Sequence, residues 1–273
     1  MADSLRLMCI LAHPDDESLG TGGTLAKYAA EGVETYLVTA TRGQRGWKGA
    51  VDDYPGPAAL AEVRSKELDA AAEVLGIRQL WLLDHMDGAL VQVDAEGITT
   101  RIAQLIRHVR PQVVVTFGPD GIYGHYDHIA VHRWTTIAVE LAADATCFPH
   151  HVNERCEPHQ VSKLYYRVIS EEQIQAMRER GEPAAMMMDG VPFSFVGPPM
   201  AEITTVIDVS QYVEHKLRAI RCHATQVGRG SRFSDVSADA QEDPLLAQEH
   251  FVLARSRVGW PAGVETDLFD RLR

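Results

Sequence analysis

The chain has 273 residues, of which 45% are hydrophobic, enough to bury the core of one large α/β domain or of two small ones. A formal net charge of −12, without any concentrated run of Lys or Arg, argues against nucleic acid as a partner. No apolar stretch approaches the roughly 20 residues that span a bilayer, and no secretory signal is evident, so we expect a soluble cytoplasmic protein.

The composition also bears on domain organisation. We expect one domain over residues 1–273, with a core at 1–145 and a C-terminal elaboration at 146–273. The four cysteines lack the CxxC spacing of zinc knuckles and redox pairs, so neither is indicated. The sequence leaves a homo-oligomer open.

The first half of the chain alternates between strand and helix signals. Apolar or β-rich runs predict strands at 5–12, 33–41, 79–83 and 112–117. Helix-forming segments predict helices at 25–31, 58–75, 98–109 and 129–143. The alternation requires right-handed crossovers and predicts an α/β fold with a doubly wound, parallel sheet. In the commonest order of that fold, 3-2-1-4, strands one and four are neighbours.

The signals weaken beyond residue 145. We expect strands at 161–170 and 203–209, helices at 171–181, 211–225 and 243–255, and a Met-, Gly- and Pro-rich loop at 184–199. Long irregular insertions near the carboxyl ends of strands commonly line ligand sites. We therefore expect the segment 147–199 to shape a substrate pocket.

Two polar segments follow the first and fourth strands. HPDDE at 13–17 places one imidazole and three carboxylates directly after the first strand, which Pro14 ends because it restricts the preceding residue and lacks an N–H. A second segment, at 118–128, contains two histidines and two aspartates. Because strands one and four are neighbours at the switch point, the two segments should face each other across one crevice.

These segments contain the ligand types of a catalytic zinc site. His13 and Asp16 are three residues apart and can aim at a common point, and His128 can supply a third ligand from the other segment. Two imidazoles and one carboxylate with open positions are typical of catalytic zinc. Zinc would lower the pKa of a bound water to about 7. Asp15 cannot easily point the same way as both neighbours, so we interpret it as the general base on that water.

The second segment adds three candidates for the reaction. His125, as a cation, can stabilise an oxyanion or protonate a leaving amine, and Tyr123 can donate its phenol O–H to the same oxyanion. Asp127 can hold the second nitrogen of a metal-bound histidine. Tyr123 can equally be a packing aromatic. Together the two segments predict metal-assisted hydrolysis of an amide.

AHPDDE at 12–17 and YGHYDH at 123–128 resemble the motifs of the LmbE-like, or PIG-L, family of zinc-dependent N-acetylglucosaminyl deacetylases. The resemblance implies a Rossmann-like three-layer sandwich and one zinc ion per chain on His13, Asp16 and His128, with other divalent metals such as Fe²⁺ left open. It also implies Asp15 as base, with His125 assisting the oxyanion or the leaving group. The implied partner is a small-molecule N-acylated amino-sugar conjugate.

Two further residues are assigned by the resemblance alone. Arg64 and Asp87 match positions that touch the sugar in family members, so we expect substrate contacts there. Without the resemblance, Arg64 would be interpreted as a solvated partner of Glu67 or Glu62 on its own helix. Gln44 departs from the family, because many members carry a glutamate at that position.

Two alternative functions are open. The same metal and base can add water to, or remove it from, an unsaturated acid, and an excess of cationic over sugar-stacking pocket residues would favour that hydratase. The other alternative is a Rossmann-type NAD- or ligand-binding domain. Gly20, Gly22 and Gly23 suggest a dinucleotide fingerprint, but its third glycine would fall at Leu25, so we interpret these glycines as packing at the start of a helix.

Overall fold

The computed structural model describes residues 4–147, 157–188, 190–227, 233 and 238–273. Within these residues the centre is a seven-stranded sheet in the order β3-β2-β1-β4-β5-β9-β8, which confirms the predicted order of the first four strands. The strands β1 to β5 pair in parallel, and β9 runs antiparallel to β5 and β8. The strands are β1 (Arg6–Leu11), β2 (Glu34–Thr41), β3 (Gln79–His85), β4 (Val113–Phe117), β5 (Lys163–Val168), β8 (Thr205–Asp208) and β9 (Gln248–Ser256).

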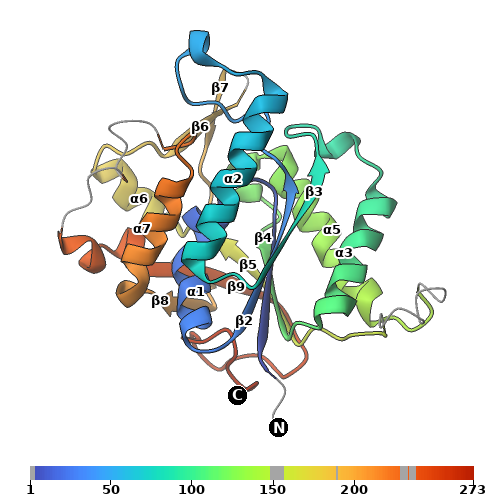
Figure 1. Ribbon diagram of the computed structural model, residues 1–273. Coiled ribbons are helices and arrows are strands. Elements are labelled where there is room, and N and C mark those ends of the chain that lie inside the picture. The colour runs from blue at the N-terminus through green and yellow to red at the C-terminus, as the bar shows by residue number, and fades with distance from the viewer. Residues whose placement is uncertain (1–3, 148–156, 189, 228–232, 234–237) are drawn as a thin grey trace.

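Helices cover both faces of this sheet, which makes a three-layer α/β sandwich. Figure 1 shows α1, α2 and α7 on one face and α3 and α5 on the other. The helices are α1 (Asp16–Ala30), α2 (Pro57–Leu75), α3 (Ala95–Val109), α4 (Gly121–Gly124), α5 (Tyr126–Ala143), α6 (Glu171–Glu179), α7 (Val213–Cys222) and α8 (Pro244–Ala247). Within the described ranges, no helix has the length and apolar content needed to cross a membrane.

The covered faces explain the sequence of the central strands. Leu7 to Leu11 of β1 are almost completely buried, as are Val113 to Val115 of β4. Strands that are buried on both faces read as continuous apolar runs, because no side of the strand meets water. The central strands β1 and β4 could therefore be recognised from their hydrophobicity.

The helix α1 begins at Asp16, not at residue 25 as predicted. Its glycines caused the error, since glycine disfavours a helix interior. They permit close packing: a Cβ on Gly23 would lie 2.5 Å from the side chain of Val209, and one on Gly22 would lie 3.3 Å from that of Lys216. These glycines lie inside a helix packed against α7 and against Val209, which follows β8, as the helix-packing interpretation requires.

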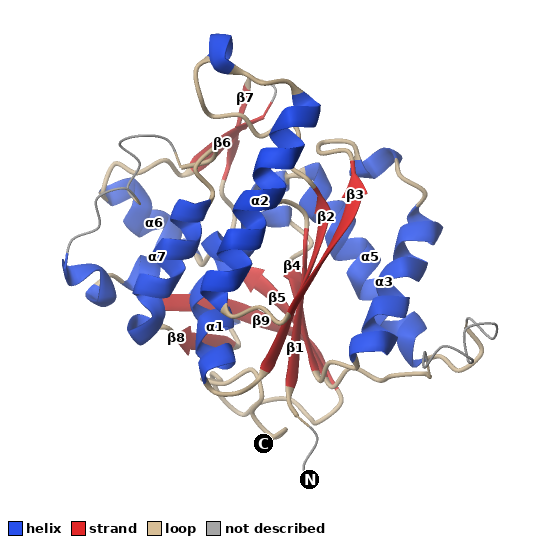
Figure 2. Cartoon of the chain, in the orientation of Figure 1, coloured by secondary structure: helices blue, strands red, loops and turns tan. Residues whose placement is uncertain are grey.

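Two predictions for the second half are wrong. The helix predicted at 243–255 is the single turn α8 followed by β9, because pairing with β5 and β8 buries Phe251 and Leu253 in the sheet and overrides helical propensity. The loop predicted at 184–199 contains a hairpin of β6 (Ala185–Met188) and β7 (Val191–Ser194). Figure 2 shows this hairpin at the same end of the molecule as the carboxyl ends of the parallel strands.

A buried arginine closes the end of α5. Arg107 of α3 donates hydrogen bonds to the carbonyl oxygens of Leu141 and Ala142 in the last turn of α5 and of Asp144 and Cys147 just beyond it. We expect Arg107→Met to lower the free energy of unfolding by about 3 kcal/mol, because the hydrogen bonds of a buried guanidinium are lost.

Urea denaturation measures this effect, and Arg101→Met is the matched control because Arg101 is an exposed residue of the same helix. The control should change the free energy of unfolding by less than about 0.5 kcal/mol. An equal loss in both variants would contradict the capping role of Arg107.

Candidate metal centre

The two polar segments meet at the carboxyl ends of β1 and β4. His13 Nδ1 lies 3.4 Å from Asp16 Oδ2 and 3.3 Å from His128 Nε2, and His128 Nε2 lies 3.5 Å from Asp16 Oδ1. Donor atoms of a tetrahedral site with bonds of about 2.0–2.2 Å are separated by roughly 3.3–3.6 Å. These three buried residues, here called the donor set, therefore lie close enough to share a divalent metal ion, with a different oxygen of Asp16 facing each histidine.

Hydrogen bonds fix which imidazole nitrogens are free to coordinate. His128 Nδ1 lies 3.2 Å from the carbonyl oxygen of Gly121, so Nδ1 carries the hydrogen and Nε2 keeps its lone pair. His13 Nε2 lies 3.0 Å from Asp87 Oδ1 and 3.2 Å from Asp127 Oδ2, so Nε2 is the donor to these carboxylates and Nδ1 is the nitrogen left to coordinate. The coordinating nitrogen of each histidine is thus the one that faces Asp16.

Asp127 and Asp87 both support His13 from outside the donor set. Asp127 is fully buried and also accepts the backbone N–H groups of Gly88 at 2.6 Å and Leu90 at 3.1 Å, so its carboxylate is held firmly. This is the position that the prediction for Asp127 requires. Asp87 also accepts the N–H of Arg45 at 3.0 Å. Its contact with His13 was not foreseen, and its sugar contact stays a prediction.

We expect Asp127→Asn to weaken zinc binding about 10- to 100-fold without abolishing it, because the amide accepts less strongly from His13 than the carboxylate does. Competition with a zinc-chelating dye measures this affinity. Asp94→Asn is a matched control, because Asp94 also accepts two backbone N–H groups, at the start of α3. Equal zinc affinity in wild type and Asp127→Asn would refute the supporting role.

Asp15 has an unusual backbone and a perturbed carboxyl group. Its φ of 111° lies in the left-handed region, which Asp and Asn tolerate better than most residues. Its N–H donates to Glu17 Oε2 at 3.0 Å, and Arg64 Nη2 lies 3.3 Å from its Oδ2. Burial raises the pKa of Asp15 to about 6 against the opposing charge of Arg64. A carboxylate with this pKa is suited to accept a proton near neutral pH.

Arg64 is buried beneath the donor set and is not a solvated residue of its helix. Its guanidinium donates to the carbonyl oxygens of Pro14 and Gly43 as well as contacting Asp15. Glu67, its proposed partner on α2, instead accepts from the backbone and hydroxyl of Thr225. The structure thus brings Arg64 to the site, and its sugar contact stays a prediction.

His125 lies beside the donor set as a neutral donor. Its Nδ1 accepts the N–H of Asp127 at 3.2 Å, which caps α5 and leaves the hydrogen on Nε2. Its ring lies 4.5 Å from the ring of His128 and 4.7 Å from that of His13. Burial, assisted by the charge of His13, lowers the pKa of His125 to about 4. These contacts favour a neutral imidazole that donates from Nε2, and the action of His125 on an oxyanion or a leaving amine stays a prediction.

Tyr123 packs against both of these histidines. Its ring lies edge-on at 5.6 Å from His125 and 5.5 Å from His128. Burial raises the pKa of its phenol, so the O–H stays protonated and able to donate. The chain beyond the β6–β7 hairpin contacts the same loop, because Phe195 meets Tyr123 edge-on and Val196 donates to the carbonyl oxygen of Ile122 at 2.7 Å. Part of the segment 147–199 thus contacts the loop that carries Tyr123, and its shaping of a substrate pocket stays a prediction.

Sequence reasoning missed one buried pair near Asp15. Glu17 Oε1 lies 2.7 Å from His223 Nε2, and both residues are fully buried. The other carboxylate oxygen, Oε2, accepts the N–H of Asp15. The two residues are 206 positions apart, so no local pattern could have paired them.

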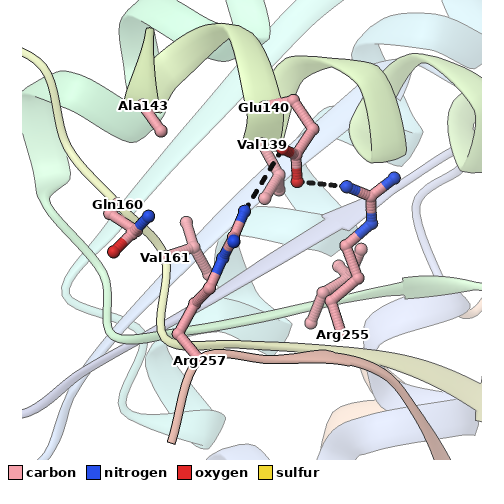
Figure 3. A pocket seen from close by; sticks show the side chains of 8 residues that line it. Val139, Glu140, Ala143, Gln160, Val161, Arg255 and Arg257 are labelled. Carbon is pink, nitrogen blue, oxygen red and sulfur yellow. Dashed lines mark hydrogen bonds and ion pairs between the residues drawn. The ribbon is translucent and has the colours of Figure 1, made fainter.

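A hollow outside this site lies between α5 and the strands β5 and β9. Figure 3 shows Glu140 between Arg255 and Arg257, with Val139, Val161 and Ala143 along the wall. Glu140 Oε2 lies 3.3 Å from Arg257 Nη2, and Glu140 Oε1 pairs with Arg255. This hollow shares no residue with the donor set, and its charged groups pair with each other.

Comparison with known proteins relates this site to a family. Residues 8–139 match the family model described as PIG-L, GlcNAc-PI de-N-acetylase. The chain is 38% identical to the 1D-myo-inositol 2-acetamido-2-deoxy-alpha-D-glucopyranoside deacetylase of Rhodococcus jostii (strain RHA1), over 97% of each chain. It is 37% identical to the protein of the same name from Kineococcus radiotolerans, over 97% of this chain and 82% of that one.

Solved structures share the fold at lower identity. The N,N'-diacetylchitobiose deacetylase from Pyrococcus horikoshii has a TM-score of 0.68 at 20% identity, covering 92% of this chain and 84% of that one. The 4-carboxy-2-hydroxymuconate hydratase from Pseudomonas putida KT2440 has a TM-score of 0.65 at 18% identity, covering 95% of this chain and 100% of that one. Because relatives above 30% identity match over nearly the whole length, the chain belongs to the PIG-L, or GlcNAc-PI de-N-acetylase, family.

Proposed function

We propose that this protein hydrolyses the N-acetyl amide of a glucosamine unit in a small conjugate, releasing acetate and the free amine. The observation that carries the proposal is the donor set with Asp15 and His125 beside it. The relatives above, named as deacetylases of a glucosamine–inositol conjugate, support the same reaction. We take that conjugate as the first substrate to test.

His13, Asp16 and His128 would hold the metal, and we propose zinc, although Fe²⁺ accepts the same nitrogen and oxygen donors. When bound, the ion polarises the amide carbonyl and makes a water acidic enough to attack at neutral pH. Asp87 and Asp127 keep the His13 ring in the orientation and tautomer that coordination needs.

The proton moves through residues of this chain. Asp15 accepts the proton of the attacking water at its carboxylate and then gives it to the leaving nitrogen, so the amine departs neutral. Arg64 holds the Asp15 carboxylate in place. His125 donates its Nε2–H to the carbonyl oxygen as negative charge develops there, and Tyr123 can add its O–H.

A panel of N-acetylated sugars assayed for acetate release tests this function. The panel includes the glucosamine–inositol conjugate, free N-acetylglucosamine and diacetylchitobiose. We expect acetate and free amine in equal amounts from at least one member, loss of activity with a chelator, and recovery with added zinc. A metal-loaded protein that releases acetate from no member would overturn the proposal.

A hydratase acting on an unsaturated acid is the second candidate, because it can use the same metal and base. The observation that favours it is a second buried cation, Arg167, whose charge acts on Asp16 and Tyr123. Loss of ultraviolet absorbance from an unsaturated dicarboxylic acid would detect this activity. The relatives above 30% identity are named deacetylases, which is why amide hydrolysis is preferred.

A further inference from the structure

Arg167, near the end of β5, carries a buried charge without an anionic partner. The residue is only 8% exposed. Its guanidinium makes no hydrogen bond or ion pair with any residue in the part of the chain that the structure describes, and its Nε is buried without a partner. A buried charge is costly unless an opposite charge or hydrogen bonds compensate it. The guanidinium is therefore available to bind the anion of a ligand.

The strand register places Arg167 at the edge of the donor set. Arg167 is the register neighbour of Phe117 in β4, and such neighbours share a face of the sheet. The ring of Phe117 lies parallel to the His128 imidazole, with ring centres 4.0 Å apart. Burial lowers the pKa of Arg167, and the charge of Asp16 is the largest effect that opposes this shift. A ligand held by Arg167 would thus lie beside the metal centre.

Helix α1 has a glycine, Gly20, at the point where the side chain of Arg167 packs against it. A Cβ on Gly20 would lie 2.3 Å from Cζ and 2.3 Å from Nε of Arg167. Glycine is unfavourable in a helix interior relative to alanine, so a packing reason is needed. The reason here is that the guanidinium of Arg167 lies against Gly20, where any larger side chain would clash with it.

The carboxylates around Arg167 are engaged elsewhere. Glu249 pairs with Lys216 at 2.8 Å and accepts two backbone N–H groups of α1. Asp120 accepts a backbone N–H at the start of α4 at 2.8 Å, and Asp16 belongs to the donor set. By contrast, Arg255 and Arg257 share Glu140 in the other hollow (Figure 3). The donors of Arg167 are left for a ligand.

We propose that Arg167 binds a carboxylate group of the ligand beside the donor set. A guanidinium is a planar fork that matches a carboxylate with two parallel hydrogen bonds. Amide hydrolysis converts a neutral acyl group into a carboxylate, so the released acetate supplies such an anion at this place. A substrate whose acyl group already ends in a carboxylate supplies the same chemistry. The idea that released acetate supplies the carboxylate rests on the proposed function. The binding of a carboxylate by Arg167 does not.

Titration calorimetry of acetate into the full-length, zinc-loaded protein tests the binding, with chloride at matched ionic strength as the blank. We expect Arg167→Gln to weaken acetate binding at least about ten-fold, and Arg167→Lys, which keeps the charge but not the fork, to lie in between. Arg257→Gln is the matched control and should stay within about two-fold, because Arg257 lies in the other hollow. Equal acetate affinity in wild type and Arg167→Gln overturns the proposal.

The melting temperature separates binding from a purely structural role. Removing an unpaired buried charge should leave the melting temperature of Arg167→Gln equal or higher. A large fall in the melting temperature of Arg167→Gln, with acetate affinity in Arg167→Lys unchanged from wild type, would assign Arg167 a structural role and overturn the proposal.

A pair of substrates distinguishes the two sources of the carboxylate. The kcat/KM values for N-acetylglucosamine and N-succinylglucosamine are compared in wild type and Arg167→Gln. A wild-type preference for the succinyl compound that Arg167→Gln loses assigns the carboxylate to the substrate. No such preference, together with weaker inhibition by acetate in Arg167→Gln, assigns it to the product.

The calorimetry does not require turnover, so the two proposals can fail separately. Acetate binding that depends on Arg167, without acetate release from any sugar, would keep the carboxylate site and refute the hydrolysis. Acetate release from a sugar, together with an acetate affinity of Arg167→Gln equal to that of wild type, would keep the hydrolysis and refute the carboxylate site.

Discussion

Asp15→Asn lowers kcat for acetate release by about 10²- to 10⁴-fold and leaves the metal content unchanged, if Asp15 is the general base. Asparagine has nearly the same shape and tolerates the φ of 111°, so the backbone at the start of α1 should persist. Its amide cannot take a proton from water, so only the proton transfer is lost. Steady-state kinetics and metal analysis of the same preparation measure the two quantities.

Asp84→Asn is the matched control for this substitution. Asp84 also has a positive φ, of 63°, but it lies on the edge strand β3, paired with Arg42 and largely exposed. We expect kcat within about two-fold of wild type, as for most exposed substitutions. An undiminished kcat in Asp15→Asn would refute its role as base, and loss of metal from that variant would make Asp15 a ligand.

The donor set could be predicted from the sequence because the strand order alone brings its residues together. Each polar segment follows a strand that is buried on both faces, and such strands are recognisable from their apolar runs. The doubly wound order then makes strands one and four neighbours, which the structure confirms. Residues over a hundred positions apart are thereby brought together without any knowledge of side-chain packing.

The support around the donor set could not be predicted in the same way. The contact of Asp87 with His13, the pairing of Glu17 with His223, and the isolation of Arg167 depend on how side chains from distant elements are oriented. Local periodicity carries no information about such contacts. For Asp87, the resemblance to a family pointed to the sugar, whereas the structure shows a contact with a candidate metal ligand.

The second half of the fold was poorly predicted for a related reason. The residues of α8 and β9 include good helix formers, and propensity is a weak guide where tertiary pairing competes with it. The strand β9 inserts between β5 and β8, so its partners come from segments that were predicted with little signal. The segment forms a strand because it pairs with β5 and β8, so its own sequence does not identify it as one.

His128→Ala and His13→Ala should each lower zinc affinity by at least about a hundred-fold, because even partners outside the ligand set typically account for 10- to 100-fold. Acetate release should fall to background in both variants, since Asp15 is left without an activated water. Metal content after dialysis, measured by mass spectrometry, should drop from one ion per chain to a small fraction.

His132→Ala separates the loss of a ligand from the loss of a packed imidazole. His132 lies one turn beyond His128 on α5, and its Nδ1 lies 3.0 Å from the carbonyl oxygen of Phe117. The control thus removes a partly buried ring and its hydrogen bond from the same helix without touching the donor set, so its metal content should equal that of wild type. His13 and His128 come from different segments. Loss of metal in both variants would therefore indicate that the two segments bind the same ion. Retention of a full equivalent of zinc in either variant would show that the ion is held elsewhere.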